Sequence, residues 1–269
     1  MKVVTFAAIK GGVGKTTLTF NFGEWLAAKG NKVLLIDSDH QCSLTQTYGI
    51  FRKPDESSLA NVFTDPKNAD IDILQVKDNL YLIPATMQLD KVNEMLATKS
   101  NKIFLMYMWM KSHYDEIKDF DYILIDCHPD FSTLTQNMIL VSDFVFSPIE
   151  PSEYGFISKD SLELRMEQFR QEAINVVTGE SLVDAKLKYL GNRIKHNTRS
   201  SRDFVKQISK DKNTLVLIPE RELFNKSTLT HIPLAEMEED STVKNRNKAF
   251  FEEVDEIFQK MSDEISKND

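Results

Sequence analysis

A glycine-rich segment, KGGVGKTT at residues 10–17, lies between a short apolar run and a segment with helical periodicity. Glycines let the backbone point its N–H groups inward around an anion, and the start of the following helix adds a favourable dipole. In such a loop Lys15 reaches the outer phosphates of a nucleotide and Thr16 holds Mg²⁺. The residues predicted to bind the nucleotide phosphates are Gly11, Gly12, Val13, Gly14, Lys15, Thr16 and Thr17.

Short apolar runs alternate with longer helical patterns along the rest of the chain. Runs of this kind, rich in β-branched residues, are typical of parallel strands that are buried on both faces. The pattern predicts an α/β fold of three layers, a mostly parallel twisted sheet with helices on both faces, as in P-loop nucleoside triphosphatases. The expected strands are 3–9, 33–37, 81–84, 122–126, 144–149, 187–190 and 215–218, and the expected helices are 16–29, 87–97, 103–117, 157–177, 200–210 and 243–265.

We expect one domain over residues 1–269, because single α/β units of about 200 to 250 residues are common. No linker interrupts the pattern, and we expect no helix-turn-helix module before the first strand. The C-terminal segment 243–266 has one apolar stripe and an acidic opposite face. Anionic lipid would require Lys or Arg on that polar face, so we predict that this helix packs on the domain.

The longest apolar run, residues 103–110, has eight residues. A membrane-spanning helix needs roughly 18 or more, so we predict a chain that does not enter a membrane. Cys42 and Cys127 are the two cysteines, which excludes a disulfide framework and fits a reducing cytoplasm.

The glycine-rich loop differs from the ordinary motif, because Ile9 stands where the first glycine is expected and Lys10 follows it. In this form it resembles the deviant loop of the ParA, MinD and nitrogenase iron protein class. The resemblance implies a homodimer that encloses ATP, in which Lys10 crosses the interface to the partner's nucleotide. Lys10 and Lys15 are therefore expected to take part in catalysis.

Three carboxylates follow two of the predicted strands, at the edge where open α/β sheets bind ligands. The segment 33–41, VLLIDSDHQ, is similar to the family's second phosphate-site motif, and 121–126, DYILID, has a Walker B pattern. We predict that Asp37 positions the attacking water. Asp39 is expected to support the Mg²⁺ shell, and Asp126 to bind Mg²⁺ through water, together with Thr16.

Histidine and cysteine stand beside these carboxylates. Cys127 and His128 follow Asp126, where the family usually has two prolines, and His40 and Cys42 follow Asp39. These four side chains carry the atoms that bind zinc. We interpret them as loop residues of the nucleotide site, since the two loops are neighbours for reasons unrelated to zinc.

The sequence favours ATP over GTP. An Asn-Lys-x-Asp guanine motif is missing, because Asn225 and Lys226 are followed by Ser227 and Thr228. Asn192 and the backbone of Pro219 resemble the adenine-side residues of the family. A polar strand end and a turn proline are the alternative interpretation of these two residues.

The net charge of −8 is unevenly distributed: residues 186–212 carry nine Lys or Arg and two Asp, which leaves −15 for the rest of the chain. In DNA-partition members of the family, basic residues in this part of the chain form a surface for non-specific DNA. A solvated helix face is the alternative. The residues predicted to contact DNA are Lys195, Arg199, Arg202, Lys206 and Arg221.

The resemblance implies a Mg²⁺-dependent ATPase with a weak intrinsic rate that segregates plasmid or chromosomal DNA. Its expected partners are a second copy in the ATP state, non-specific DNA, and a centromere-binding adaptor that stimulates hydrolysis and release. It would act in the cytoplasm, on the nucleoid. The alternative is a MinD-like positioning ATPase that acts at a membrane or on a protein cargo. The acidic C-terminal tail argues against action at a membrane. The tail also has no tyrosine, which argues against a tyrosine-kinase-like member of the family. Both cysteines flank the glycine-rich loop, which argues against an iron–sulfur reductase.

Overall fold

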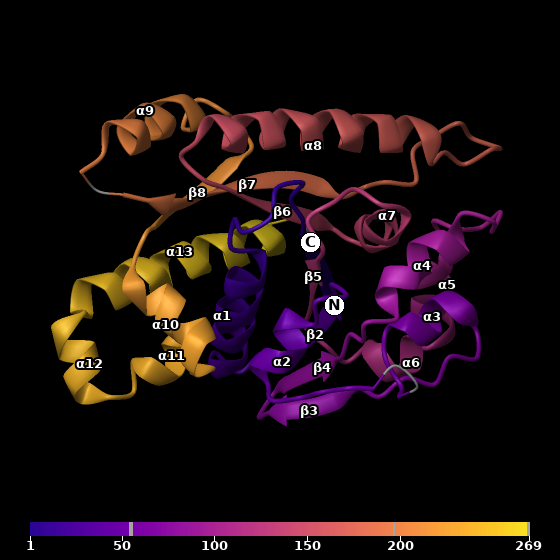
Figure 1. Cartoon of the computed structure of the whole chain (residues 1–269), viewed down its shortest axis with the longest axis horizontal. Coiled ribbons are helices and arrows are strands. Elements are labelled where there is room, and N and C mark those ends of the chain that lie inside the picture. Colours follow the sequence, from indigo (N-terminus) through magenta and orange to yellow (C-terminus); the bar gives the residue numbers. More distant parts are fainter. Residues whose placement is uncertain (54–55, 196, 268–269) are drawn as a thin grey trace.

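The computed structural model describes residues 1–53, 56–195 and 197–267, and an eight-stranded sheet forms its centre (Figure 1). The strand order is β3-β4-β2-β5-β1-β6-β7-β8. All neighbouring strands run parallel except β3 and β4, which form an antiparallel hairpin. The strands are β1 (Lys2–Phe6), β2 (Val33–Ser38), β3 (Leu74–Lys77), β4 (Leu80–Ile83), β5 (Tyr122–Cys127), β6 (Phe144–Ile149), β7 (Lys186–Ile194) and β8 (Thr214–Pro219).

Thirteen helices are found within the described residues, and they cover both faces of the sheet (Figure 1). On one face lie α3 (Ala60–Thr64), α4 (Leu89–Leu96), α5 (Leu105–Ser112), α6 (Tyr114–Ile117), α7 (Thr133–Leu140), α8 (Glu153–Glu172) and α9 (Arg199–Ile208). On the other lie α1 (Lys15–Ala28), α2 (Ser43–Thr47), α10 (Glu222–Thr230), α11 (Leu234–Met237), α12 (Ser241–Arg246) and α13 (Lys248–Ser266).

The protein has an apolar core on each face of the sheet, because successive side chains along a strand point to opposite faces. In β2, Leu34 and Ile36 enter the core under α3 to α9, whereas Val33 and Leu35 enter the core under α1 and α13. Strands that are apolar on both faces can be buried only between two layers of helices. The predicted three-layer α/β fold is therefore confirmed.

Several predicted boundaries were wrong. The first strand ends at Phe6 instead of residue 9, and the predicted helix 103–117 is two helices that meet at His113. The predicted helix 243–265 divides at Asn247, whose amide donates to the Val243 carbonyl and so ends α12. Its apolar stripe is nevertheless buried, in the core on the α1 side of the sheet.

Six elements were not expected from the sequence: β3, α2, α3, α7, α10 and α11. β3 is a four-residue edge strand whose side chains are only partly buried, so it lacks a strong apolar pattern. Its hairpin turn places Asn79 at φ 58°, a left-handed conformation that asparagine tolerates well. Within the described ranges no helix is long and apolar enough to cross a bilayer.

Candidate nucleotide site

The glycine-rich loop connects β1 to α1, in the place that the sequence predicts. Gly14 is the N-cap of α1 with φ 98°, and Gly12 has φ 75°, so both positions require glycine. A β-carbon on Gly14 would lie 2.5 Å from Asn192 Nδ2, because the Asn192 amide packs on the loop and donates to the Val13 carbonyl at 2.7 Å. The loop is therefore held in shape by β7.

Asp126 is the second-last residue of β5, beside the start of α1, and it is fully buried. The Thr16 hydroxyl donates to Asp126 Oδ2 at 2.6 Å, while Asp126 Oδ1 is buried without a hydrogen-bond partner among the described residues. Burial and, next, the neighbouring Asp37 charge raise the pKa of Asp126 to about 8. A buried carboxylate oxygen without a partner, next to a hydroxyl, is the donor set that Mg²⁺ prefers, so these residues fit the ion.

Asp37 lies opposite Asp126 in the register of β2 and β5, and it is also fully buried. Asp37 Oδ2 accepts hydrogen bonds from the backbone N–H of Thr45 at 2.8 Å and from its hydroxyl at 2.7 Å. Asp37 Oδ1 accepts from the N–H of Asp39 at 3.1 Å. Burial raises the pKa of Asp37 to about 6, although the Thr45 hydrogen bonds oppose the shift. Asp37 thus holds the loop after β2 in place.

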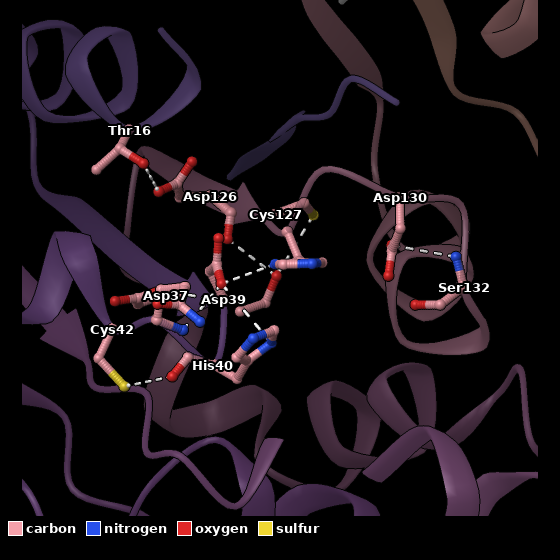
Figure 2. Close-up of polar contacts among 12 residues, drawn as sticks. Thr16, Asp37, Asp39, His40, Cys42, Asp126, Cys127, Asp130 and Ser132 are labelled. Carbon is pink, nitrogen blue, oxygen red and sulfur yellow. Dashed lines mark hydrogen bonds and ion pairs between the residues drawn. The ribbon is translucent and has the colours of Figure 1, made fainter. Parts of the chain in front are cut away.

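Asp39 follows β2 and, unlike Asp37, reaches solvent, with 13% of its side chain exposed. Figure 2 shows Asp37, Asp39 and His40 beside Asp126, at the ends of adjacent strands. His128 Nδ1 lies 2.9 Å from Asp39 Oδ1, and the backbone N–H of Gln41 donates to the same oxygen at 2.9 Å. Asp39 is therefore the more accessible of the two carboxylates after β2.

Lys10 does not point freely into solvent. Its ammonium forms an ion pair with Glu150, at the end of β6, and donates to Ser152 Oγ at 3.4 Å. Glu150 also contacts Arg193 at 3.5 Å, and Arg193 has a left-handed φ of 55°. In this state Lys10 is bound by its own chain, so any contact with a partner's nucleotide requires that this pair open.

A cavity of about 280 Å³ lies next to Gly14 and Thr17. Asn192 and Pro219, the two predicted adenine-side residues, both line it. Arg221, which the sequence assigns to DNA, lines the same cavity as the N-cap of α10. Arg221 therefore lies beside Asn192 and Pro219, which the sequence predicts to bind the nucleotide.

The other predicted DNA residues are exposed on α9 and just before it. α9 buries Ser201, Phe204 and Ile208, which leaves Arg202 and Lys206 outward. Lys195 pairs with Glu220 at 3.4 Å and Arg199 with Asp203 at 3.6 Å, whereas Arg202 and Lys206 form no ion pair within the described part of the chain.

Thr45, Glu150 and Arg193 were not found from the sequence. Glu150 follows β6, so the rule that identified Asp37 and Asp126, a carboxylate at the end of a buried strand, applies to it as well. Thr45 and Arg193 carry no sequence signal, because their roles depend on contacts between separate strands and helices.

Fold and site together define a nucleotide-binding protein of the phosphate-loop class. An AAA domain family model matches residues 1–177. The sporulation initiation inhibitor protein Soj of Bacillus subtilis (strain 168) is 36% identical over 158 residues, which are 57% of this chain and 60% of Soj. Maintenance of carboxysome distribution protein A of Synechococcus elongatus is 29% identical over 238 residues, 87% of this chain and 92% of that protein.

A solved structure of a Borrelia burgdorferi B31 protein assigned to plasmid partition, bound to AMPPNP, has a TM-score of 0.75 and 25% identity, and the match covers 97% of this chain and 99% of that chain. The chain belongs to the ParA/MinD family of ATPases.

Proposed function

We propose that this chain hydrolyses ATP with Mg²⁺, and that ATP drives the formation of a homodimer that segregates DNA. The observation that carries the proposal is the contact of Thr16 with Asp126, directly after Lys15 at the start of α1, with a buried Asp126 oxygen that lacks a partner among the described residues. The AMPPNP-bound structural relative supports a nucleotide at this place. Thr16 and Asp126 would hold Mg²⁺, and the ion supplies positive charge to the phosphate oxygens.

For water positioning we propose Asp39 in direct contact and Asp37 behind it. The sequence assigned this role to Asp37, but Asp37 is fully buried and three hydrogen bonds already occupy most of its acceptor positions. Asp39 is partly exposed on the same loop, and the Asp37 contact to its N–H orients it. Asp37 is then a positioning residue.

Lys10 is proposed to act in the dimer, on the nucleotide of the partner. Its ion pair with Glu150 holds it near the loop in the single chain. The negative charge of a partner's phosphates competes with Glu150 for the same ammonium group, so ATP and dimer formation would open the pair together. Asn192, Pro219 and Arg221 line the cavity that we assign to the adenosine part.

The DNA surface is proposed on α9, where Arg202 and Lys206 face outward, with Lys195 and Arg199 nearby. A dimer doubles the number of phosphate contacts, and each contact adds about 0.9 to the log–log salt slope. Non-specific binding by the ATP dimer therefore exceeds that by the single chain. We further propose nucleoid association and an adaptor that stimulates hydrolysis.

The test is binding to a random duplex with ATP, ADP or no nucleotide, at two salt concentrations. We expect tight, sequence-independent binding with ATP but not with ADP or without nucleotide. Arg202→Glu should bind more weakly and with a flatter salt dependence. A matched control is Lys260→Glu on α13, which is exposed and lies outside α9. Binding that ignores the nucleotide, or that Arg202→Glu leaves unchanged, contradicts the DNA proposal.

A second candidate is the positioning of a protein cargo. The carboxysome-distribution relative aligns with more of this chain than Soj does, 87% against 57%. Deletion in the host separates the two functions: loss of a plasmid or of chromosome inheritance supports DNA segregation, whereas a mislocated protein body with normal inheritance supports cargo positioning.

A further inference from the structure

Two histidines and one carboxylate meet at the ends of β2 and β5. The strands pair in parallel with Asp37 opposite Asp126 and Ser38 opposite Cys127, so one further step brings Asp39 level with His128. His40 follows Asp39, and the rings of His40 and His128 have centroids 4.4 Å apart. Neither histidine is used by the proposed ATPase site.

The distances suit a single metal ion. His128 Nδ1 lies 2.9 Å and His40 Nδ1 3.9 Å from the same oxygen, Asp39 Oδ1, and one ligand atom from each of the three residues lies within 4.8 Å of the others. A tetrahedral ion with bonds of about 2.1 Å keeps its ligand atoms about 3.4 Å apart, and the first two distances lie on either side of that value. Small side-chain rotations would complete the geometry.

The neighbouring cysteines do not belong to this group. Cys127 Sγ accepts from Ser38 Oγ at 3.4 Å, and Cys42 Sγ donates to the His40 carbonyl at 3.3 Å. Both thiols are buried, and neither sulfur is among the ligand atoms that lie together at Asp39, His40 and His128. His40 and His128 are instead 28% and 30% exposed, which leaves an entry path from solvent.

We propose that Asp39, His40 and His128 form a binding site for a divalent transition-metal ion of the Zn²⁺ type, separate from the Mg²⁺ position beside Asp126. Two imidazoles and one carboxylate select such ions over Mg²⁺, which prefers oxygen ligands. Three protein ligands leave one position open for water or for an oxygen of a bound molecule. The adjacent Pro129 packs on the phosphate loop, since a β-carbon on Gly11 would lie 3.7 Å from Pro129 Cγ.

The site would control hydrolysis through Asp39. An ion bound to Asp39 Oδ1 ties that carboxylate to the two histidines, so it can no longer serve the attacking water. Zn²⁺ then slows ATP hydrolysis while ATP and Mg²⁺ remain bound. This consequence, but not metal binding itself, rests on the proposed function.

The test is a titration of the nucleotide-free protein with Co²⁺, whose strong visible absorption reports four-coordinate binding, followed by displacement with Zn²⁺. We expect one ion per chain. His40→Asn and His128→Asn each remove a ligand and should weaken binding by more than about tenfold, the lower end of the loss seen for groups that only support a ligand. His231→Asn is the matched control: His231 is exposed and has φ 57°, a conformation that asparagine accepts.

Asp126→Asn separates the new site from the Mg²⁺ position, and we expect it to retain the Co²⁺ spectrum. The proposal is overturned if the wild type shows no four-coordinate Co²⁺ absorption, or if His128→Asn binds Co²⁺ as tightly as the wild type. It is also overturned if Asp126→Asn removes Co²⁺ binding and the histidine variants do not. ATP turnover with Mg²⁺ in excess is measured separately: Zn²⁺ should slow the wild type but not His128→Asn. A protein that binds Co²⁺ as expected but never hydrolyses ATP contradicts the proposed function and leaves the metal site standing.

Discussion

Asp126→Asn should stabilise the nucleotide-free protein and abolish its response to Mg²⁺. Burial raises the pKa of Asp126 from 3.8 to about 8, whereas the unfolded chain ionises it near its ordinary value. The folded state therefore binds the proton more tightly, and wild-type stability falls as the pH rises from about 4 to about 8. Asparagine has no such proton, and its side-chain oxygen can still accept from the Thr16 hydroxyl.

The size of the effect follows from linkage. Each pH unit between the unfolded and folded pKa values is worth about 1.4 kcal/mol, so the advantage of the variant should grow by on the order of 4 kcal/mol between pH 5 and pH 8. Above pH 8 it should level off. This is a large part of the roughly 5 to 15 kcal/mol that stabilises a typical domain.

Urea unfolding at pH 5, 7 and 8.5 without nucleotide measures the difference directly. Asp119→Asn, a change at an exposed carboxylate, is the control and should shift stability by less than about 0.5 kcal/mol at every pH. Mg²⁺ should add to the rise in melting temperature that ATP causes in the wild type, but not in Asp126→Asn. A variant that is no more stable than the wild type at pH 8.5, or a difference that is constant with pH, would refute the reasoning.

Three further outcomes are expected. Asp39→Ala should bind ATP and accumulate as a dimer with little turnover, measured by gel filtration and phosphate release, because its role lies in the transition state; normal turnover would exclude Asp39 as the water-positioning group. Equal amounts of Lys10→Ala and Asp39→Ala, each inactive alone, should recover about a quarter of wild-type activity if Lys10 acts on the partner's nucleotide; heterodimers without activity would contradict this. Glu150→Gln should strengthen the ATP dimer about two- to fivefold in sedimentation experiments, since a partly exposed ion pair is worth up to about 1 kcal/mol; weaker dimers would show that Glu150 supports the interface.

The phosphate loop and the strand–helix order could be predicted because both rest on local physics. Gly14 and Gly12 have left-handed φ values in a loop whose turns require them, and Lys15 and Thr16 follow at the start of a helix. The continuous apolar runs of β2 and β5 reflect burial on two faces, a property of each strand alone. The class of fold and the phosphate site were therefore accessible without coordinates.

The roles of individual polar residues depend on which strands are neighbours. The pairing of β2 with β5 buries Asp37 and places Asp39 beside His128, and no local pattern distinguishes these two aspartates. Likewise, the position of Arg221 at the cavity lined by Asn192 and Pro219 and the pairing of Lys10 with Glu150 join segments far apart in the sequence. Burial and long-range contacts set the solvation and charge of each carboxylate, so only the tertiary structure decided that Asp37 and Asp126 are buried and that Asp39 reaches solvent.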